Sequence, residues 1–301
     1  MQLQQLIYFV TVAEQGSFNK AAEKLFTTQP NLSKAINNLE TDLNVNIFER
    51  TNKGVKLTDE GKKLYQYAKT IINQIELING LASDEAVKML SVATYPIITM
   101  GRLVSDFYNS HRNEKIAIKL VERRLYEVIE MVENGEAEIG FIMSKHVQDK
   151  ELRHMLKFKG LELHMLGIDT WYVNVGPSHP FYDREEVTMA EMLDFPFVRL
   201  PDDYFSNLTH YLEIDGVRLT NFTNTIYVND TAAILAFLTR TDAFRFGPSL
   251  STKDFKAHGV KTIPIKNCNI KITVGWIQKK KEILSPEAKE FVKQLEALYH
   301  I

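Results

Sequence analysis

Apolar side chains recur every three or four positions in three short runs near the start of the chain, with polar residues between them. This spacing predicts three helices, at residues 3–14, 18–25 and 29–43, whose apolar faces form one small core. Ser17 and Thr28 precede the second and third helices, where a hydroxyl can accept from free backbone N–H groups. Two short helices joined by a tight turn predict a helix-turn-helix. Its second helix has an amide-rich outer face that can read a major groove.

After these helices the pattern alternates and then becomes helical again. Residues 45–48 and 55–58 alternate around an Asn-Lys-Gly turn, which predicts a β-hairpin, the wing of a winged helix-turn-helix. A long helix follows, capped by Thr58, with apolar or small residues at three- and four-residue spacing. These positions are Gly61, Leu64, Ala68, Ile71, Ile75, Ile78 and Ala82. The stripe either packs on its own domain or forms a coiled-coil seam, and the length and polar flanks of the helix favour dimerisation.

Beyond residue 88, short apolar runs alternate with helical segments. Such runs predict buried strands, and their alternation with helices is typical of an α/β fold with parallel sheets. The expected strands lie at residues 89–94, 116–121, 137–143, 163–175, 197–200, 226–228, 243–246 and 270–278. The expected helices lie at residues 97–108, 126–133, 189–193, 230–238 and 285–298.

The composition indicates the cellular compartment of the protein and does not change the predicted fold. The 301 residues are 45% hydrophobic and 25% charged, as in ordinary globular proteins, with a formal net charge of −2. The single cysteine, Cys268, excludes an intrachain disulfide framework and fits a reducing cytosol. No apolar run is long enough to span a membrane, and the N-terminal stretch lacks the pattern of a signal peptide, so we expect a cytoplasmic protein.

Motifs of enzymes and metal sites are not found in the sequence. It contains no phosphate-binding lysine loop, no GxGxxG and no GxSxG, and its eight histidines do not show the spacing of metal ligands. We therefore expect no catalytic residues, no metal and no cofactor. The alternatives are a small-molecule-binding protein or an α/β enzyme without a role on DNA. A transporter's solute-binding protein would not need residues 1–87.

A set of short motifs occurs in the order and spacing of one known family. In the N-terminal region they are Ala21-Ala22, Gln29-Pro30, Leu32-Ser33, Ile36, Leu39-Glu40, Leu43, Phe48-Glu49-Arg50, Leu57-Thr58 and Gly61. Later landmarks are Glu122, Asn134-Gly135-Glu136, Glu138, His179-Pro180 and Pro248. The chain resembles the LysR-type transcriptional regulators, and the resemblance covers its whole length.

The resemblance implies an α/β protein that binds a double-stranded DNA operator and contacts RNA polymerase. It implies a homodimer or homotetramer that responds to a small-molecule co-inducer. An N-terminal winged helix-turn-helix and a linker helix would precede a periplasmic-binding-protein-like effector domain of two Rossmann-like α/β subdomains. The expected boundaries are 1–58 for the DNA-binding domain, 59–87 for the linker and dimerisation helix, and 88–301 for the effector domain. Subdomain one would comprise 88–163 and 265–301, and subdomain two 164–264, with crossings near Leu163 and Ile265.

The candidate DNA-binding residues lie at the start of the third helix and on the wing. The amide of Gln29 can donate and accept in the plane of a base edge, and Pro30 offers an apolar surface to a thymine methyl. Lys34 stands where the family often has arginine, and lysine lacks the bidentate geometry of arginine toward guanine. The expected contacts are Thr28, Gln29, Pro30, Asn31, Ser33, Lys34, Asn37, Arg50 and Lys53. Residues 17–56 hold six basic against four acidic side chains, so we expect modest non-specific affinity.

The candidate effector residues follow strand ends, because ligands of open α/β sheets bind beyond the carboxyl ends of strands. Arg123 and Arg124 either clamp a carboxylate or phosphate or lie exposed on a helix start. Arg245 lies inside a strand that is usually apolar in the family the chain resembles. A buried or cleft-facing arginine must be paired, so we expect it to face either a ligand or an internal acid. The expected site comprises Thr94, Tyr95, Pro96, Arg123, Arg124, Leu200, Asn229, Thr231 and Arg245. Together these side chains predict a small, polar, anionic effector.

Overall fold

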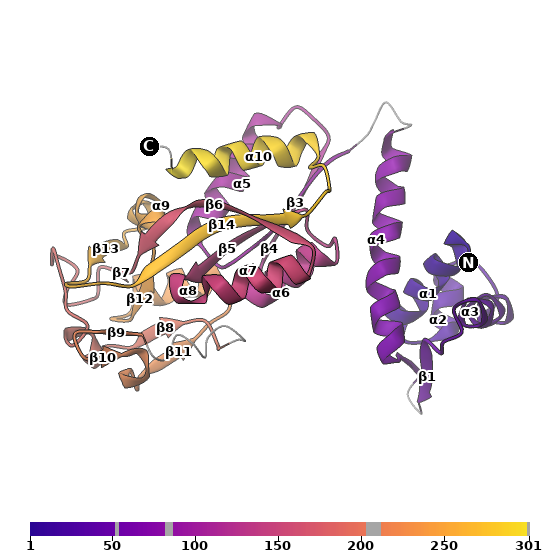
Figure 1. Cartoon of the computed structure of the whole chain (residues 1–301), viewed down its shortest axis with the longest axis horizontal. Coiled ribbons are helices and arrows are strands. Elements are labelled where there is room, and N and C mark those ends of the chain that lie inside the picture. The colour runs from indigo at the N-terminus through magenta and orange to yellow at the C-terminus, as the bar shows by residue number, and fades with distance from the viewer. Residues whose placement is uncertain (52–53, 82–86, 203–211, 300–301) are drawn as a thin grey trace. The chain divides into compact units, whose positions relative to one another are not determined.

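The computed structural model describes residues 1–51, 54–81, 87–202 and 212–299, which form two compact units, Met1–Ala86 and Val87–Ile301 (Figure 1). Each unit has its own hydrophobic core, and each is described by itself. No helix among the described residues has the length and apolar character needed to cross a membrane.

Three helices and a hairpin build the head of the first unit. The helices are α1 (Leu3–Gln15), α2 (Phe18–Lys24) and α3 (Gln29–Leu43), and the hairpin strands are β1 (Phe48–Thr51) and β2 (Gly54–Leu57). Phe9, Ile36 and Leu39 are fully or almost fully buried between the helices. The carboxylate of Glu40 accepts from the backbone N–H groups of Ile47 and Phe48, at 2.8 and 3.3 Å. This contact fixes the hairpin to α3, and the predicted winged helix-turn-helix is confirmed.

The turn between α2 and α3 is a Schellman motif. The Ser17 hydroxyl accepts from Lys20 N–H at the start of α2. At its end, Phe26 N–H donates to the Glu23 carbonyl at 3.2 Å and Thr27 N–H to the Ala22 carbonyl at 3.0 Å. Thr28 occupies the N-cap position of α3, but its side chain makes no capping hydrogen bond, so the predicted capping role is wrong.

The long helix α4 (Asp59–Leu81) carries one apolar stripe, of which the first half is packed and the second half is exposed. Thr58 Oγ1 accepts from Gly61 N–H at 2.9 Å, as predicted. Leu64 and Ala68 pack into the core of their own unit. A Cβ at position 61 would lie 2.1 Å from the Ile47 carbonyl oxygen, so the close approach there requires glycine. The first half of the predicted seam is therefore internal packing.

The second half of α4 keeps an exposed apolar stripe. Tyr67, Ile71 and Ile78 are 68%, 38% and 61% exposed. Ile75 lies between them and is half-buried. Residues spaced by three and four share one helix face, so these four side chains form a continuous surface. Of the predicted seam, this second half is the part that is exposed and could contact a partner helix. The predicted Ala82 lies outside the described residues.

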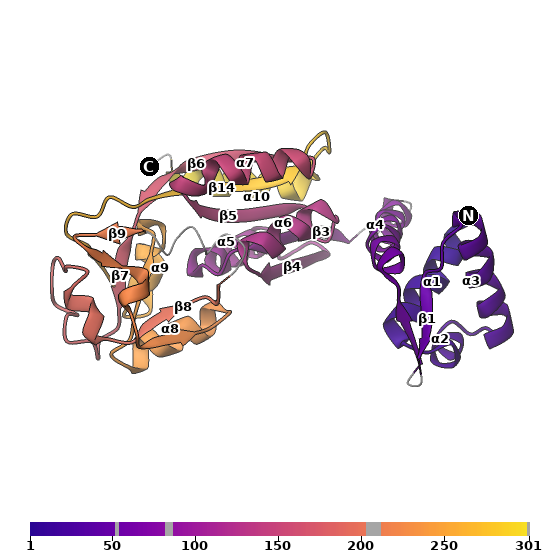
Figure 2. The ribbon, with the colours of Figure 1, turned by 60° about the horizontal axis from the view of Figure 1, so that its bottom comes forward.

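The second unit contains two five-stranded sheets, each with helices packed on it (Figure 2). The first half of this unit is built on the sheet β4-β3-β5-β14-β6. Its strands are β3 (Lys88–Thr94), β4 (Ile116–Glu122), β5 (Ile139–Lys145), β6 (Leu161–Thr170) and β14 (Lys271–Lys279). Its helices are α5 (Ile98–Ser110), α6 (Leu125–Glu133), α7 (Asp149–Phe158) and α10 (Pro286–Glu296). Helices α5 and α10 share one core, and α6 and α7 share the other.

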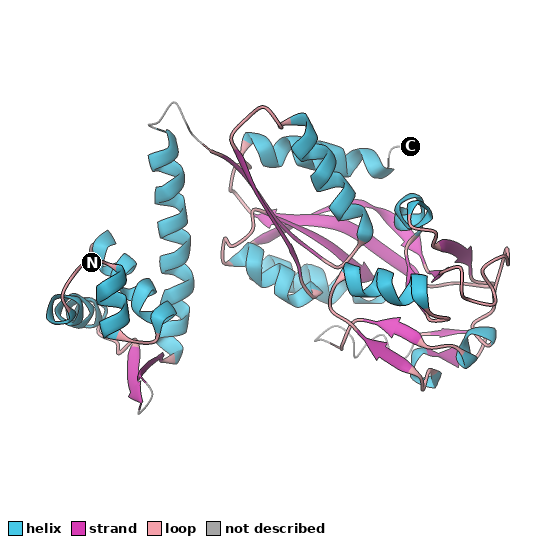
Figure 3. Ribbon diagram, turned by 180° about the vertical axis from the view of Figure 1, so that it is seen from behind, coloured by secondary structure: helices cyan, strands magenta, loops and turns pink. Residues whose placement is uncertain are grey.

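The second half is built on the sheet β11-β8-β12-β7-β13 (Figure 3). Its strands are β7 (Tyr172–Val175), β8 (Phe197–Arg199), β11 (Thr225–Tyr227), β12 (Phe244–Gly247) and β13 (Lys261–Pro264). A separate hairpin pairs β9 (Glu213–Ile214) with β10 (Val217–Arg218). Helices α8 (Thr231–Arg240) and α9 (Thr252–Ala257) pack on the sheet. The helix expected at 189–193 is a 3₁₀ turn, Glu191–Asp194, and the sequence pattern did not predict α7, α9 and β13.

Both sheets are mixed, which corrects the expectation of parallel sheets. Strand β3 is parallel to β4 and β5, whereas β14 is antiparallel to β5 and β6. In the other sheet, β7 is antiparallel to β12 and β13. The antiparallel strands enter their sheets from the opposite half of the unit. No crossover helix of the same sheet precedes them. The alternation of helices and strands therefore predicted the wrong direction for these strands.

The chain crosses between the halves later than predicted. Strand β6 stays paired with β14 as far as Thr170, and Trp171 leads directly into β7 of the other sheet. The predicted crossing near Leu163, and the subdomain boundary placed there, are therefore wrong. The sequence predicts strands within residues 163–175, but it does not show where one ends, because Gly167, Asp169 and Thr170 lie inside β6 and not in a turn between the sheets. The chain returns between Pro264 and Lys271.

Candidate DNA interface and effector cleft

The outer face of α3 presents polar side chains to solvent. Its buried side carries Leu32, Ile36 and Leu39. The exposed predicted residues are Pro30, Asn31, Lys34 and Asn37. Thr28, directly before the helix, is also exposed. The helix thus offers a polar face with one cation, of a width that suits a major groove.

Gln29 and Ser33 differ from their neighbours because they already bond to each other. Gln29 Nε2 donates to Ser33 Oγ at 2.8 Å, one helical turn away, and both side chains are half-buried. This bond restricts the Gln29 amide before any DNA is bound. Ser33, an expected DNA contact, therefore also has a structural contact that the sequence did not indicate.

The hairpin carries the remaining predicted DNA contacts. Arg50 lies in β1 opposite Val55 of β2, and Lys56 is exposed on the second strand. Lys53 lies outside the described residues. Because the hairpin follows α3 and is held to it through Glu40, its position relative to the reading face is fixed.

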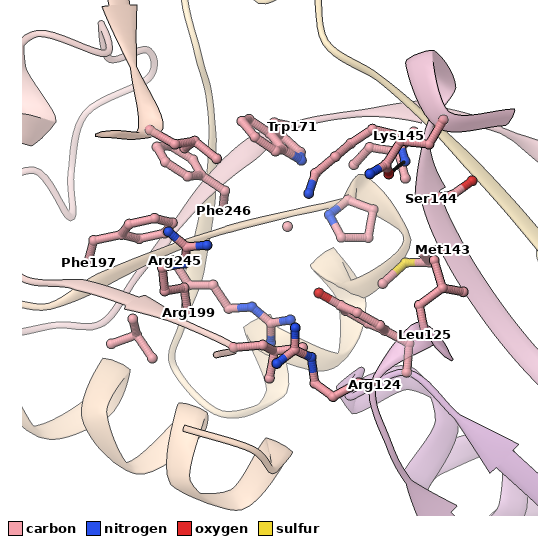
Figure 4. A pocket seen from close by; sticks show the side chains of 18 residues that line it. Arg124, Leu125, Met143, Ser144, Lys145, Trp171, Phe197, Arg199, Arg245 and Phe246 are labelled. Carbon is pink, nitrogen blue, oxygen red and sulfur yellow. Dashed lines mark hydrogen bonds between the residues drawn. The ribbon is translucent and has the colours of Figure 1, made fainter. Parts of the chain in front are cut away.

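A cleft of about 130 Å³ lies in the second unit, between its two halves (Figure 4). The first half contributes residues of β5 and α6, and the second half contributes residues of β8 and β12. The lining comprises Tyr95, Arg124, Leu125, Met143, Ser144, Lys145, Gln148, Trp171, Phe197, Val198, Arg199, Leu200, Leu219, Arg245, Phe246, Gly247, Pro248 and Ile272. A cavity of about 150 Å³ is enough to hold one benzene ring, so this cleft suits a small ligand.

The charge of the lining is entirely positive. Arg124, Lys145, Arg199 and Arg245 all border the cleft, and none of the lining residues is an aspartate or glutamate. Arg199 is paired with Asp202, which lies outside the lining. Four cations without a carboxylate among the lining residues create a positive potential that attracts anions.

Arg245 is the most buried of these cations. It lies in β12 and is only 8% exposed, and its Nη2 donates to the Pro96 carbonyl at 3.2 Å. Burial lowers the pKa of its guanidinium, while nearby Tyr95 and Glu122 act in the opposite direction. No carboxylate of a described residue forms an ion pair with it. A buried charge without a counter-ion is costly, so an anion entering the cleft would stabilise it.

Aromatic rings form an apolar wall beside the cations. Trp171 stacks on Phe246 with centroids 5.2 Å apart and an interplanar angle of 9°. Phe197 contacts Phe246 edge-on at 5.0 Å, and Lys145 Nζ lies 5.8 Å from the Trp171 ring centroid. The cleft can therefore hold a ligand that is both charged and partly apolar.

The cleft contains four of the nine predicted effector residues. Tyr95, Arg124, Leu200 and Arg245 line it, whereas Thr94, Pro96, Arg123, Asn229 and Thr231 do not. Thr94 is completely buried, and Pro96 acts through the carbonyl that accepts from Arg245. Arg123 and Asn229 are exposed to solvent. Proximity to a strand end was thus insufficient to place a side chain in the cleft.

Thr231 is absent from the lining because the protein itself occupies the anion site at its helix start. Thr231 N–H donates to Glu122 Oε2 at 2.8 Å, and the Thr231 hydroxyl donates to the other carboxylate oxygen. Glu122 ends β4 in the first half, and Thr231 begins α8 in the second. A second tie joins Arg102 Nε of α5 to Asp254 Oδ1 of α9 at 2.5 Å. These contacts hold the two halves together beside the cleft.

Several lining residues were missed by the sequence analysis. Lys145 ends the buried strand β5, so the strand-end rule that selected Thr94 could have found it. Phe197 and Phe246 lie within strands and had no signal beyond their apolar character. Trp171 lies at the crossing between the halves, and only the correct position of that crossing brings it to the cleft.

Comparison with protein families divides the chain in the same order. Residues 3–62 match a model described as a bacterial regulatory helix-turn-helix protein of the lysR family. Residues 85–299 match the LysR substrate binding domain.

Similar proteins and structures have related descriptions. The HTH-type transcriptional regulator BenM of Acinetobacter baylyi is 26% identical over 273 residues, covering 88% of this chain and 86% of that protein. CitR of Bacillus subtilis, an HTH-type transcriptional regulator, is 27% identical over 264 residues, 84% of each chain. The crystal structure of CbnR, a LysR family transcriptional regulator, superimposes with a TM-score of 0.65 at 20% identity over 100% of both chains. CbnR in complex with its target DNA gives a TM-score of 0.63 at 21% identity, over 99% of this chain and 100% of that one.

Proposed function

Because the chain belongs to the LysR family of DNA-binding transcriptional regulators, we propose that a small anionic effector, bound in its cleft, controls how it binds an operator. The family match covers the helix-turn-helix and the substrate-binding domain. The cleft supports our proposal for the chemistry of the effector and for the residues that bind it. The exposed face of α3 supports our proposal for the residues that bind DNA. We assign residues 1–58 to DNA binding, 59–87 to the linker and 88–301 to the effector.

The buried guanidinium of Arg245 is the main observation that supports an anionic effector. An anion that reaches Arg245 gains a charge-assisted hydrogen bond in an environment of low dielectric constant. Lys145, Arg199 and Arg124 add positive charge from both halves. The stacked Trp171 and Phe246 favour an anion with a flat apolar part. The small volume of the cleft favours a carboxylate of about the size of one ring.

Control of DNA binding then requires the effector to favour one arrangement of the two halves. Arg124 and Lys145 belong to the first half, and Arg199 and Arg245 belong to the second. An anion between them favours the arrangement that brings the cations together. It can shift the equilibrium only by its difference in affinity for the two arrangements. The ties from Glu122 and Arg102 oppose any arrangement that separates the halves.

A thermal-shift panel tests the charge of the effector. The panel contains small mono- and dicarboxylates, phosphate and sulfate, each beside a neutral amide or alcohol of similar shape. At about 100 times its Kd, a fitting carboxylate is expected to raise the melting temperature by about 5 °C or more, because it binds only the folded state. Its neutral counterpart is expected to have no effect. A panel in which only neutral aromatic compounds stabilise the protein would refute an anionic effector.

On DNA, we propose that α3 reads the major groove and that the hairpin contacts the backbone beside it. Gln29, Pro30 and Lys34 would face base edges, with Asn31 and Asn37 beside them. Thr28, Ser33, Arg50 and Lys53 would contact phosphates. The structure of CbnR with its target DNA supports this use of the fold. The protein would act in the cytoplasm, where it also contacts RNA polymerase.

We further propose that the exposed stripe of α4 joins two protomers. Two-fold symmetry lets two helix-turn-helix heads bind two half-sites of one operator, which compensates for the weakly basic surface of each head. The stripe of Tyr67, Ile71, Ile75 and Ile78 is apolar and continuous, as a seam between helices requires.

Charged substitutions in this stripe are expected to separate the protomers. The double variant Ile71→Glu, Ile78→Glu places like charges on both sides of the seam. It is expected to sediment as a monomer and to bind operator DNA at least about tenfold more weakly, because the second head no longer adds its contacts. Gln66→Glu introduces a charge at an exposed position outside the stripe and is the matched control. A double variant that sediments like the wild type would place the dimer contact elsewhere.

A further inference from the structure

Phe26 has the most exposed large apolar side chain of the described residues. It is 99% exposed and lies in the turn between α2 and α3. Its backbone has a φ of 50°, in the left-handed region, and it occupies the position after the helix cap in the Schellman motif. Glycine is the usual residue there, and asparagine is the common alternative, because a larger side chain meets its own backbone.

Neither the conformation nor the exposure of Phe26 helps the unit to fold. A non-glycine residue in the left-handed region is strained, and a solvated ring gains nothing from the hydrophobic effect. The backbone hydrogen bonds of the turn would form equally well with asparagine at this position. Residues that break local rules in this way are expected at functional sites.

The position of Phe26 relative to α3 indicates what it contacts. Phe26 lies three positions before Gln29, so the two Cα atoms are at most about 11 Å apart. The major groove is about 12 Å wide. When the Gln29 amide is in the groove, the turn is therefore within reach of the sugar-phosphate strand that borders it. This placement rests on the proposed reading of DNA by α3.

We propose that Phe26 packs its ring against the deoxyribose carbons of this strand. Sugar carbons offer an apolar surface to the ring, and every nucleotide presents them. The contact should therefore add affinity without distinguishing sequences. The ring is neutral and displaces no counterion, so the contact should leave the salt dependence of binding unchanged.

A second copy of the chain is a weaker candidate for this ring. One aromatic side chain buries about 150–250 Å². A specific protein interface buries about 1,200–2,000 Å². The residues next to Phe26 do not extend it into a patch of that size. Leu25 packs against the core of the unit, Glu23 and Lys24 are charged, and Thr27 and Thr28 are polar.

The test uses full-length Phe26→Asn. Binding is measured by fluorescence anisotropy to a duplex selected by the wild-type protein from a random pool, and to a scrambled duplex. We expect the Kd to rise on both duplexes by the same factor, about fivefold for each head. This is the loss expected if the sugar contact in the wild type removes roughly half of one ring face from water. The slope of log K against log salt should not change. The melting temperature should stay the same or rise, because asparagine suits the left-handed backbone.

Two further variants complete the experiment. Phe26→Tyr keeps the ring and should restore most of the affinity. Phe158→Asn removes a ring that is 88% exposed in the second unit and should leave DNA binding unchanged. The proposal is wrong if Phe26→Asn binds like the wild type, if it weakens only the selected duplex, or if it changes sedimentation without changing the Kd.

Gln29→Ala in the same assay separates this inference from the proposed function. If Gln29→Ala loses discrimination and Phe26→Asn binds normally, α3 still reads DNA and only the role of Phe26 fails. If both variants bind like the wild type, the proposed reading face itself is wrong.

Discussion

Replacing Gln29 with alanine is expected to abolish the preference for a cognate operator over a scrambled duplex. One bidentate amide–base pair contributes about 1–3 kcal/mol of discrimination. Two heads on two half-sites double this contribution, so the ratio of the two Kd values is expected to fall by about 30-fold to about 10⁴-fold. Competition gel shifts with both duplexes, at one salt concentration, measure the ratio.

The fold should not change in this variant. Gln29 is half-buried and bonds only to Ser33 among the described residues, so far-ultraviolet circular dichroism and the melting temperature should match the wild type. Asn38→Ala is the matched control, because Asn38 is an exposed amide of α3 that is not among the expected DNA contacts. Equal discrimination by wild type and Gln29→Ala would remove this residue from the reading face.

Arg245→Met is expected to abolish the response to the effector while leaving the protein at least as stable. Truncating one partner of a buried charge pair costs about 2–5 kcal/mol, so the affinity for the stabilising anion should fall by at least about 30-fold. Methionine removes a buried charge that forms no ion pair with a described carboxylate. The desolvation free energy that is no longer spent on the buried charge offsets the lost hydrogen bond to Pro96. The free energy of unfolding should therefore stay the same or rise.

The measurement uses the anion with the largest thermal shift in the panel, titrated by calorimetry into both proteins. Arg123→Met is the control, because Arg123 lies close in sequence to the cleft but is exposed outside its lining. We expect wild-type affinity in the control. If Arg123→Met loses the anion and Arg245→Met keeps it, the ligand binds at the start of α6 and the cleft assignment fails.

The DNA-binding head could be predicted from sequence because its signals are local. Apolar spacing placed the three helices, and the alternating residues around 52–54 placed the hairpin. Each of these features depends on contacts between neighbours in the chain. The exposed face of α3 lies opposite the buried positions of Leu32, Ile36 and Leu39, so the helical period alone identifies its polar residues.

The cleft could be predicted only in part because it depends on how distant segments pair. The tie between Glu122 and Thr231 joins residues more than a hundred positions apart, and no local pattern indicates it. Thr231 follows a strand end, which predicts a ligand contact, but its N–H and hydroxyl are already bonded to Glu122. The crossing at Trp171 is equally hard to predict, because β6 and β7 follow each other with one residue between them and no turn marks where the chain changes sheets.

The crossing residue also gives the protein an optical property. The chain contains two tryptophans. Trp276 is buried, with its ring stacked 4.0 Å from the ring of His164. Trp171 is also buried, but it lines the cleft, near Lys145, at the point where the two halves join, whereas Trp276 is not among the lining residues. Intrinsic fluorescence of this protein is therefore an internal reporter in which one emitter senses the ligand site and the other supplies a reference.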